Sequence, residues 1–249
     1  MREALQGKVE AKLEPLLRQV YGSAAATHLL GRITGMIERW RPAMAPRRPW
    51  LDQSDAMLIT YADTLQASGQ TSGQVGDEAP LAVLRRFLVA RAGDRLSAVH
   101  LLPFYPWTSD DGFSVVDYRA VDPAVGGWAD VAALGRDFEP MLDAVINHAS
   151  AESAWFQAFR RGEAPWRDWF IRCDPAADYR SVVRPRALPL LTEVETVDGP
   201  VHVWTTFSAD QVDLNFAEPG LLLEILDLLL DYCAKGARFI RLGITIGFM

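Results

Sequence analysis

The chain has 249 residues, of which 49% are hydrophobic and 23% are charged, and its formal net charge is −7 at pH 7. This composition can bury a sizeable core and excludes a wholly disordered chain. An acidic chain has no overall field that would attract nucleic acid or an anionic membrane, so neither is expected as a partner. Two cysteines, Cys173 and Cys233, are too few for a disulfide scaffold or a four-cysteine zinc site.

The first residues indicate no export signal. Residues 1–17, MREALQGKVEAKLEPLL, carry charges throughout and lack the apolar core of a signal peptide. The most hydrophobic run, residues 221–230, contains Glu224 and Asp227 and is too short to cross a bilayer. We therefore expect a cytoplasmic protein.

Residues 1–50 are predicted to form a helical N-terminal extension. Apolar side chains recur there at spacings of three and four, the pattern of one helix face, at Leu29, Ile33, Met36, Ile37 and Trp40. Several arginines lie close to tryptophans at the end of this segment, namely Arg39, Arg41, Arg47 and Arg48 beside Trp40 and Trp50. Such a group can bind a nucleic acid or a phosphate, but in an acidic chain a solvated helix end is the favoured interpretation.

From residue 56 onward, short apolar runs alternate with helical patterns. Four strands are expected, at residues 56–61, 96–104, 141–148 and 238–244, with helices around residues 81–93 and 221–235, a loop over residues 66–80 and a cap at Gly236. Near-continuous apolar strands separated by helices are typical of a parallel sheet with crossover helices.

A long insert interrupts this alternation. It covers residues 149–200, is rich in Trp, Arg and Pro, and is too long for a plain crossover connection, so we interpret it as a subdomain. The expected domains are the extension (1–50), a first part of a catalytic fold (51–148), the insert (149–200) and a continuation of the fold (201–249).

Polar residues gather just past the carboxyl ends of three predicted strands, where parallel α/β folds place their sites. These residues are Asp110 and Asp111 within SDDGF, then Asp143, Asn147 and His148, and then Arg241. Each also has a structural interpretation: the two aspartates can cap a loop, and His148 can be a satisfied histidine at a strand end. Three such clusters at one end of a sheet favour a functional site.

Other catalytic motifs are absent from the sequence. It holds no phosphate-binding glycine loop with a lysine, no GxSxG and no HExxH. Cys233 lies in a leucine-rich helix, where a core position is favoured over a nucleophile.

Longer motifs resemble the α-amylase superfamily of glycoside hydrolases and transglycosidases (glycoside hydrolase family 13). The segments DAVINH (143–148), QVDLNF (211–216) and GARFIRL (236–242) are similar to its signature regions. The surrounding text resembles the sucrose phosphorylase subfamily, at LITYAD (58–63), HLLPFYPWTSDDGFSVVDY (100–118), VVRPRALPLLT (182–192) and HVWTTFSADQVDLN (202–215). The form SDDGFSVVDY and the helical extension look most like its glucosylglycerate phosphorylase branch.

This resemblance implies the N-terminal part of a (β/α)8 barrel, truncated to about its first half, and a retaining phosphorolysis that yields α-glucose 1-phosphate. Its partners would be a small α-glucoside, with glucosylglycerate preferred to sucrose, and inorganic phosphate. No cofactor is implied. The superfamily often binds calcium through the asparagine that matches Asn147, but the phosphorylase branch generally does not, so no metal is expected.

The resemblance also implies roles for individual residues. Asp110 and His148 match positions that bind the glucosyl hydroxyls, and Arg241 matches the arginine that holds the nucleophile. Phe113 and Phe207 match apolar walls of the glucose subsite. From their charge we add Arg184 and Arg186 as candidate contacts for phosphate or an anionic acceptor, with a structural role equally open.

The chain departs from the family at the nucleophile. The family sequence RLDA reads RLGI here, so Gly243 stands at the position of the nucleophilic aspartate, and IGFM (246–249) is displaced by one position. The resemblance places the acid/base glutamate and the stabilising aspartate on later strands, so none of the three catalytic carboxylates is expected in this chain. The alternative is therefore a non-catalytic fragment or pseudoenzyme that at most binds sugar. Exposed barrel edges would favour self-association.

Overall fold

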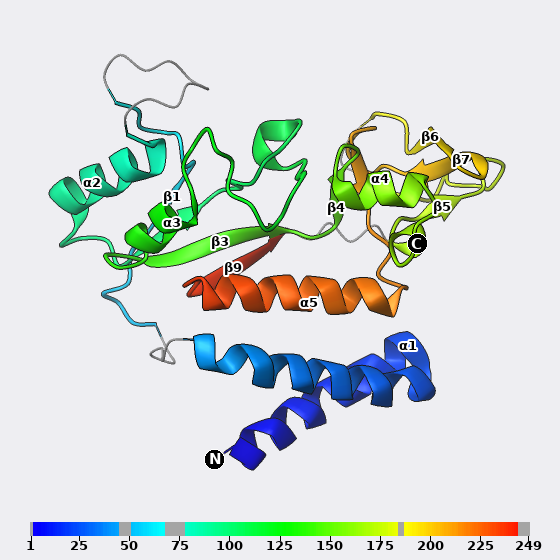
Figure 1. The fold of residues 1–249 in the computed structure, drawn as a ribbon, viewed down its shortest axis with the longest axis horizontal. Helices are drawn as coiled ribbons and strands as arrows, with labels where there is room; N and C mark the ends of the chain where they lie inside the picture. The colour runs from blue at the N-terminus through cyan, green and yellow to red at the C-terminus, as the bar shows by residue number, and fades with distance from the viewer. Residues whose placement is uncertain (1, 45–50, 68–77, 184–186, 244–249) are drawn as a thin grey trace.

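Four parallel strands form the central sheet of the computed structural model, which describes residues 2–44, 51–67, 78–183 and 187–243 (Figure 1). Their order is β1-β2-β3-β9, with bounds β1 Met57–Thr60, β2 Ala98–Leu101, β3 Glu139–Val145 and β9 Phe239–Gly243. The strands are in parallel register, with Leu58 opposite Val99 and Asp143 opposite Arg241. This arrangement confirms the predicted parallel sheet.

Helices connect the strands, namely α2 (Pro80–Ala92), α3 (Trp128–Leu134) and α5 (Pro219–Ala234), and the apolar patterns predicted two of the three, α2 and α5. Gly236 follows α5 with a φ of 110°, a left-handed conformation that glycine adopts without strain. Apolar side chains of strands and helices share one buried core, including Leu81, Leu84, Val99, Leu101, Leu142, Leu221 and Ile225. The seven-residue helix α3 was not predicted, because it spans only two turns.

The third predicted strand, 141–148, is wrong in its bounds. Strand β3 ends at Val145, and His148 begins a separate strand, β4 (His148–Ser150), which pairs antiparallel with β8 (Gln211–Asp213). The apolar run continues across this break, so hydrophobicity alone does not mark it. The chain leaves the parallel sheet at residues 146–147 because His148 finds its ladder partner in Asp213, far along the sequence.

The other strands are shorter than expected. Strand β2 ends at Leu101, before Pro103, which has no backbone N–H for a ladder hydrogen bond. The last strand, β9, ends at Gly243, and residue 244 of the predicted strand lies outside the described residues.

The insert has its own small sheet beside the main one (Figure 1). Helix α4 (Ala154–Arg160) precedes three antiparallel strands in the order β5-β7-β6, with bounds β5 Arg172–Cys173, β6 Leu191–Thr196 and β7 Gly199–Trp204. Strand β7 runs across the boundary that we expected at residue 200. The domain division stays a prediction, and the strand indicates that the insert continues to about residue 204.

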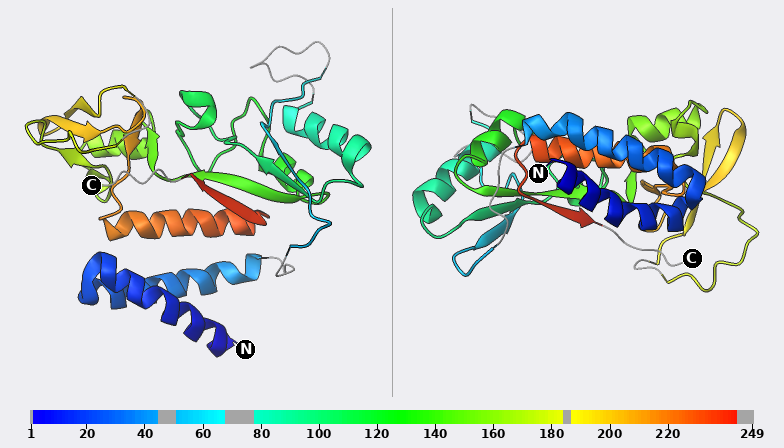
Figure 2. Two further views of the ribbon diagram at one scale, coloured as in Figure 1. Left: turned by 180° about the vertical axis from the view of Figure 1, so that it is seen from behind. Right: turned by 90° about the horizontal axis from the view of Figure 1, so that it is seen from below.

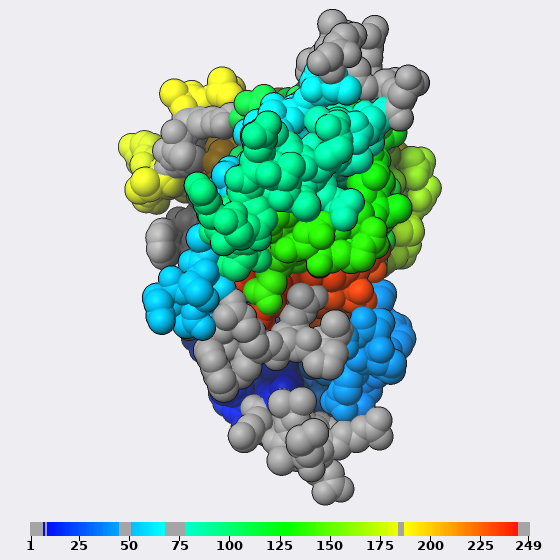
Figure 3. All heavy atoms as spheres, turned by 90° about the vertical axis from the view of Figure 1, so that its left-hand side faces the viewer, coloured from blue at the N-terminus to red at the C-terminus, as the bar shows by residue number. Residues whose placement is uncertain are grey.

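Helix α1 (Arg2–Trp40) is a helical hairpin that packs against α5 (Figures 1 and 2). The chain reverses at Gly22, whose φ of 78° falls in the left-handed region. Three residues of the predicted apolar face, Leu29, Ile33 and Met36, are buried against Leu223 of α5. The space-filling view shows the extension as a layer below α5 (Figure 3). The extension predicted over residues 1–50 is thus helical through Trp40 and the short turn Arg41–Ala43, and residues 45–50 lie outside the description.

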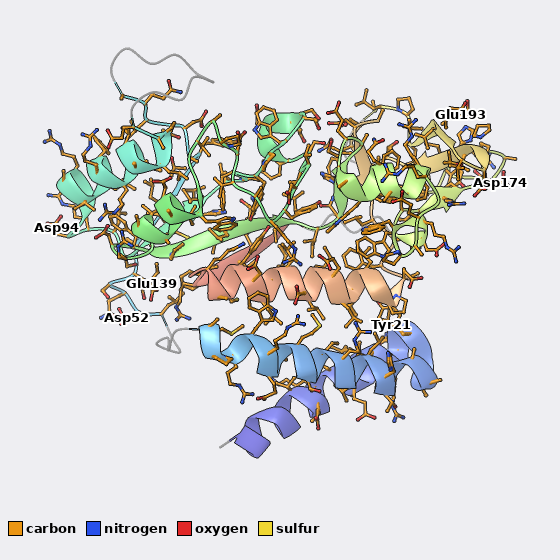
Figure 4. The ribbon with its side chains drawn as sticks, viewed as in Figure 1. Tyr21, Asp52, Asp94, Glu139, Asp174 and Glu193 are labelled. Atoms are coloured by element: carbon orange, nitrogen blue, oxygen red, sulfur yellow. The ribbon has the colours of Figure 1, made fainter. Side chains whose placement is uncertain are left out.

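Hydrogen bonds hold α1 to α5 and to the residues just before it at two separate points. The Tyr21 hydroxyl donates to the carbonyl of Phe216, 2.7 Å away, just before α5 (Figure 4). At the other end, Trp40 Nε1 donates to Asp227 Oδ1 at 2.8 Å, and Arg39 pairs with the same carboxylate. Arg41 pairs with Glu38, while Arg47, Arg48 and Trp50 of the basic group are not described.

Candidate functional site

The carboxyl ends of β2, β3 and β9 open into one cavity of about 280 Å³. All five residues that the sequence assigned to substrate binding line it, namely Asp110, Phe113, His148, Phe207 and Arg241. Gly243, at the predicted nucleophile position, lines it too. The cavity also includes Asn147 and Gln211, and the second of these was not predicted. Arg184 and Arg186 lie outside the described residues.

His148 is held rigidly at the floor of this cavity. Its Nε2–H donates to the carbonyl of Phe113 at 2.8 Å, so Nδ1 accepts from the side-chain amide of Asn147 at 2.7 Å. The Phe207 ring meets the imidazole edge-on, with centroids 5.2 Å apart. These contacts fix the tautomer and orientation of His148, which is 3% exposed.

Asp110 lies on a tight turn with left-handed backbone. Asp110 and Asp111 have φ values of 59° and 51°, and Gly112 has a φ of 95°. A side chain at Gly112 would approach the Pro103 carbonyl within 2.8 Å, so this position requires glycine. Non-glycine residues in the left-handed region store strain that the surrounding structure must hold, and such strain is concentrated at functional sites.

Asp210 holds that turn from the other side. Its carboxylate accepts hydrogen bonds from the hydroxyls of Thr108 (2.6 Å), Ser150 (3.2 Å) and Ser109. Burial raises the pKa of Asp210, but the hydroxyl hydrogen bonds together hold it below its ordinary value.

The neighbouring Gln211 connects two of the predicted site residues. Its Nε2 donates to Asp110 Oδ2 at 3.0 Å and lies 3.2 Å from His148 Nε2. Sequence analysis missed Gln211 and Asp210 as site residues, although both fall in the HVWTTFSADQVDLN segment. Their role depends on strand pairing between β4 and β8, for which the sequence carries no local signal.

Arg241 is anchored below the cavity by a buried carboxylate. Asp143, which is fully buried, accepts from Arg241 Nη1 at 3.1 Å and from His100 Nε2 at 2.8 Å. The Tyr105 hydroxyl donates to the Asp143 carbonyl at 2.7 Å. Arg241 is half exposed toward the cavity, so its charge is available at the cavity wall.

Gly243 leaves space where a side chain would fit. A Cβ placed there would have ordinary contacts, 3.6 Å from the Ala144 carbonyl oxygen and 3.7 Å from Val145 Cα. Two residues earlier on the same strand, Arg241 lies on the same face, because side chains alternate along a strand. An acidic side chain at position 243 would therefore lie on the same side of β9 as the Arg241 guanidinium.

Asp213 of β8 lies behind this site in a buried setting. Burial raises the pKa of Asp213 to about 6, although hydrogen bonds from the backbone and the hydroxyl of Thr206, both at 2.8 Å, partly oppose this rise. Its neighbour across the ladder is His148.

The cavity thus combines polar groups with two phenyl rings. Carboxylate, amide, imidazole and guanidinium groups suit a ligand with several hydroxyls, and the rings of Phe113 and Phe207 suit its apolar face. Among the described residues, no group of three or more His, Cys, Asp or Glu side chains could hold a metal ion. No helix in the described part of the chain is long and apolar enough to cross a bilayer.

Residues 95–244, which contain every described residue of the cavity, match the family description "Alpha amylase, catalytic domain". The chain belongs to the α-amylase family. This membership accounts for the parallel sheet with crossover helices, since the sheet is the beginning of an α-amylase barrel.

Relatives narrow the resemblance to phosphorylases. The chain is 45% identical over 247 residues to glucosylglycerate phosphorylase of Allomeiothermus silvanus, covering 96% of this chain and 42% of the relative. It is 44% identical over 238 residues to glucosylglycerate phosphorylase of Spirochaeta thermophila, covering 93% and 39%. This chain therefore spans about two fifths of the length of these relatives.

A solved structure agrees with the fold. The crystal structure of sucrose 6F-phosphate phosphorylase from Thermoanaerobacter thermosaccharolyticum superposes with a TM-score of 0.67 at 24% identity, over 78% of this chain and 40% of that one. The expected fold class, an α-amylase-type barrel represented by about its first half, is thereby confirmed. The assigned roles of the cavity residues stay predictions.

Proposed function

We propose that the cavity binds the glucosyl unit of a small α-glucoside, within a retaining phosphorylase that releases α-glucose 1-phosphate. The convergence of five predicted residues on one cavity supports this proposal. In the proposed complex, Asp110 and His148 bind glucosyl hydroxyls, and Phe113 and Phe207 form the apolar walls. Hydrogen bonds of this kind strengthen as positive charge develops on the sugar ring, which favours the transition state.

In the proposed reaction a carboxylate attacks the anomeric carbon, an acid protonates the departing oxygen, and phosphate then takes the glucosyl group. Arg241 would hold the attacking carboxylate by a charge-assisted hydrogen bond. We propose glucosylglycerate as the substrate in preference to sucrose, because the relatives with 44% and 45% identity bear that name. Arg184 and Arg186 are proposed contacts for phosphate or the glycerate carboxylate.

The second candidate function is sugar binding without catalysis. Gly243 favours it, because glycine has no side chain with which to attack a substrate. We propose this second function for residues 1–249 taken alone. We propose the phosphorylase function for the gene lineage to which the chain belongs.

One chimera tests the phosphorylase. Residues 1–249, carrying Gly243→Asp and the family register over residues 244–249, are joined to the remaining C-terminal part of the Allomeiothermus silvanus relative. We expect phosphate-dependent release of α-glucose 1-phosphate from glucosylglycerate at a higher kcat/KM than from sucrose. The Gly243→Ala chimera is the matched control and should be inactive. Equal or reversed rates on the two glucosides would contradict the substrate assignment.

Site variants of the active chimera test the cavity. His148→Ala and Phe207→Ala are expected to lower kcat/KM roughly tenfold or more, since they remove contacts to the glucosyl unit. Unchanged kinetics in both variants would show that the cavity is not the glucose subsite.

A further inference from the structure

A second and larger cavity, of about 760 Å³, is lined by residues of α1, α5 and the insert. It shares no lining residue with the candidate active site. Three indole rings from the insert form one wall, those of Trp155, Trp166 and Trp169. Trp155 and Trp169 pack edge-on with centroids 5.2 Å apart, so the wall is a continuous aromatic surface.

The acidic groups that α5 contributes to this cavity are paired with arginines. Glu224 accepts from Arg119 at 2.8 Å, and Asp227 accepts from Arg119 at 3.1 Å and also pairs with Arg39. By contrast, Arg32 of α1 lines the cavity and has no hydrogen bond or ion pair within the described ranges. The uncompensated charge at this cavity is therefore positive.

Two indole nitrogens at the same wall also lack acceptors. Nε1 of Trp166 and Nε1 of Trp169 are buried and have no hydrogen-bond partner among the residues that the structure describes. Trp169 is 4% exposed, and its Nε1 faces Gly220 on the cavity wall, where an added Cβ would be 3.8 Å away. Buried N–H groups almost always have a hydrogen-bond acceptor in native proteins, so two indole N–H groups without one at the same cavity need an explanation.

The three groups named above without a partner, the Arg32 guanidinium and the two indole N–H groups, are all donors, and one of them is cationic. They call for a ligand rich in acceptors that carries negative charge. The indole faces suit the C–H face of a pyranose ring, and apolar walls with a few directed polar groups are typical of small-molecule sites. We propose that this cavity binds an anionic pyranose, a sugar phosphate or a sugar acid, at a site separate from the candidate active site.

Two glycines of α1 keep the cavity open. Gly31 and Gly35 lie one turn apart and both line it, and a Cβ on either would meet no atom within 4 Å. A larger side chain at position 35 would fill the cavity without a clash. Because glycine is a poor residue in a helix interior, such a variant is also expected to fold at least as well as the parent chain.

Binding is measured by tryptophan fluorescence and by thermal unfolding, at submicromolar concentration of residues 1–249. The ligands are glucose 6-phosphate, glucuronate, neutral glucose and inorganic phosphate. We expect saturable binding of glucose 6-phosphate or glucuronate, with affinity at least tenfold above that for glucose or phosphate alone. Comparison of the first two ligands distinguishes a sugar phosphate from a sugar acid.

Variants locate the binding site. Gly35→Leu should abolish binding, and Arg32→Gln should weaken it about tenfold, a loss of about 1.4 kcal/mol. Gly7→Leu is the matched control, since Gly7 lies in the first arm of the α1 hairpin, where an added Cβ also meets no atom within 4 Å, and away from the cavity, and it should bind normally. His148→Ala, in the candidate active site, should also bind normally.

Three results would overturn the proposal. The first is no saturable binding of either anionic sugar by the parent chain. The second is binding that survives Gly35→Leu but is lost in His148→Ala, which would place the ligand in the candidate active site. The third is equal affinity for glucose and for its anionic derivatives.

Discussion

Asp143 of β3 and Arg241 of β9 occupy paired positions on neighbouring strands, and Arg241 Nη1 donates to Oδ1 of this fully buried carboxylate at 3.1 Å. From the strand on the other side, His100 of β2 donates to the same carboxylate at 2.8 Å. One buried carboxylate therefore joins three adjacent strands and orients the arginine that lines the candidate site.

Replacement of Asp143 by alanine is expected to destabilise the chain by roughly 3 kcal/mol, because it leaves the buried His100 and the arginine without their acceptor. Urea unfolding followed by circular dichroism measures the change. Asp94→Ala is the matched control at an exposed position at the end of α2 (Figure 4) and should have almost no effect. Equal effects of the two substitutions would contradict the structural role of Asp143.

The raised pKa of Asp213, about 6, predicts a pH-dependent stability. Between about pH 4 and pH 6 the Asp213 carboxyl is protonated in the native chain. In the unfolded chain, where the pKa of an aspartate carboxyl is about 3.9, it is ionised over the same range. The free energy of unfolding contributed by Asp213 therefore falls as the pH rises through this window, by roughly 2–3 kcal/mol.

Asp213→Asn tests this dependence, since the asparagine oxygen can accept from the Thr206 backbone N–H while its amide donates to the Thr206 hydroxyl, without a charge. Urea unfolding at pH 4.5 and at pH 7.5 should show the variant gaining stability relative to the parent as the pH rises. A constant difference between variant and parent at the two pH values would show that Asp213 titrates normally.

Asp210 is predicted to hold the turn that carries Asp110. Asp210→Ala removes the acceptor of three hydroxyls and should release the strained backbone of Asp110 and Asp111. Hydrogen exchange of residues 108–114 is expected to accelerate about tenfold or more, because this segment loses its anchor. Unchanged exchange in that segment would contradict the prediction. Asp210→Asn keeps one acceptor oxygen and should have an intermediate effect.

Residues 1–249 alone are predicted to release no α-glucose 1-phosphate above a control without enzyme, because position 243 offers no nucleophile. Gly243→Asp in the same short chain should also be inactive, since the acid/base glutamate of the family resemblance lies on a later strand. Turnover that follows the purified protein would show that another group replaces these carboxylates.

Self-association through the sheet edges is a further prediction. Among the described strands, β1 and β9 each pair on one side only, and Ile59 and Leu242 are 61% and 46% exposed. Unpaired strand edges with exposed apolar side chains favour association or precipitation.

Light scattering tests this association. The parent chain is expected to form dimers and larger species, and Ile59→Lys with Leu242→Lys should shift it toward monomer. Val197→Lys is the control, because Val197 is 69% exposed but lies in the turn between β6 and β7, away from both edges. A monodisperse monomer of the parent chain with a cooperative thermal transition would contradict the prediction.

Local patterns were enough to predict several elements and the edge of the sheet that carries the candidate site. The apolar runs predicted four parallel strands, a leucine-rich run that ends at Gly236 predicted α5, and the spacing of three and four predicted the face of α1 that buries Leu29 and Ile33. Asp110, His148 and Arg241 could be placed together because parallel strands end at the same edge. These features depend on hydrophobic periodicity, which each segment carries within itself.

Tertiary structure alone decided the contacts between distant segments. The break between β3 and β4, the hydrogen bond from Gln211 to Asp110 and the hydroxyl cluster around Asp210 all require the pairing of β4 with β8. The cavity between α1, α5 and the insert likewise joins three separate parts of the chain. Such pairings depend on which surfaces remain to be buried once the local elements have formed, and the period of a single segment holds no information about its distant partner.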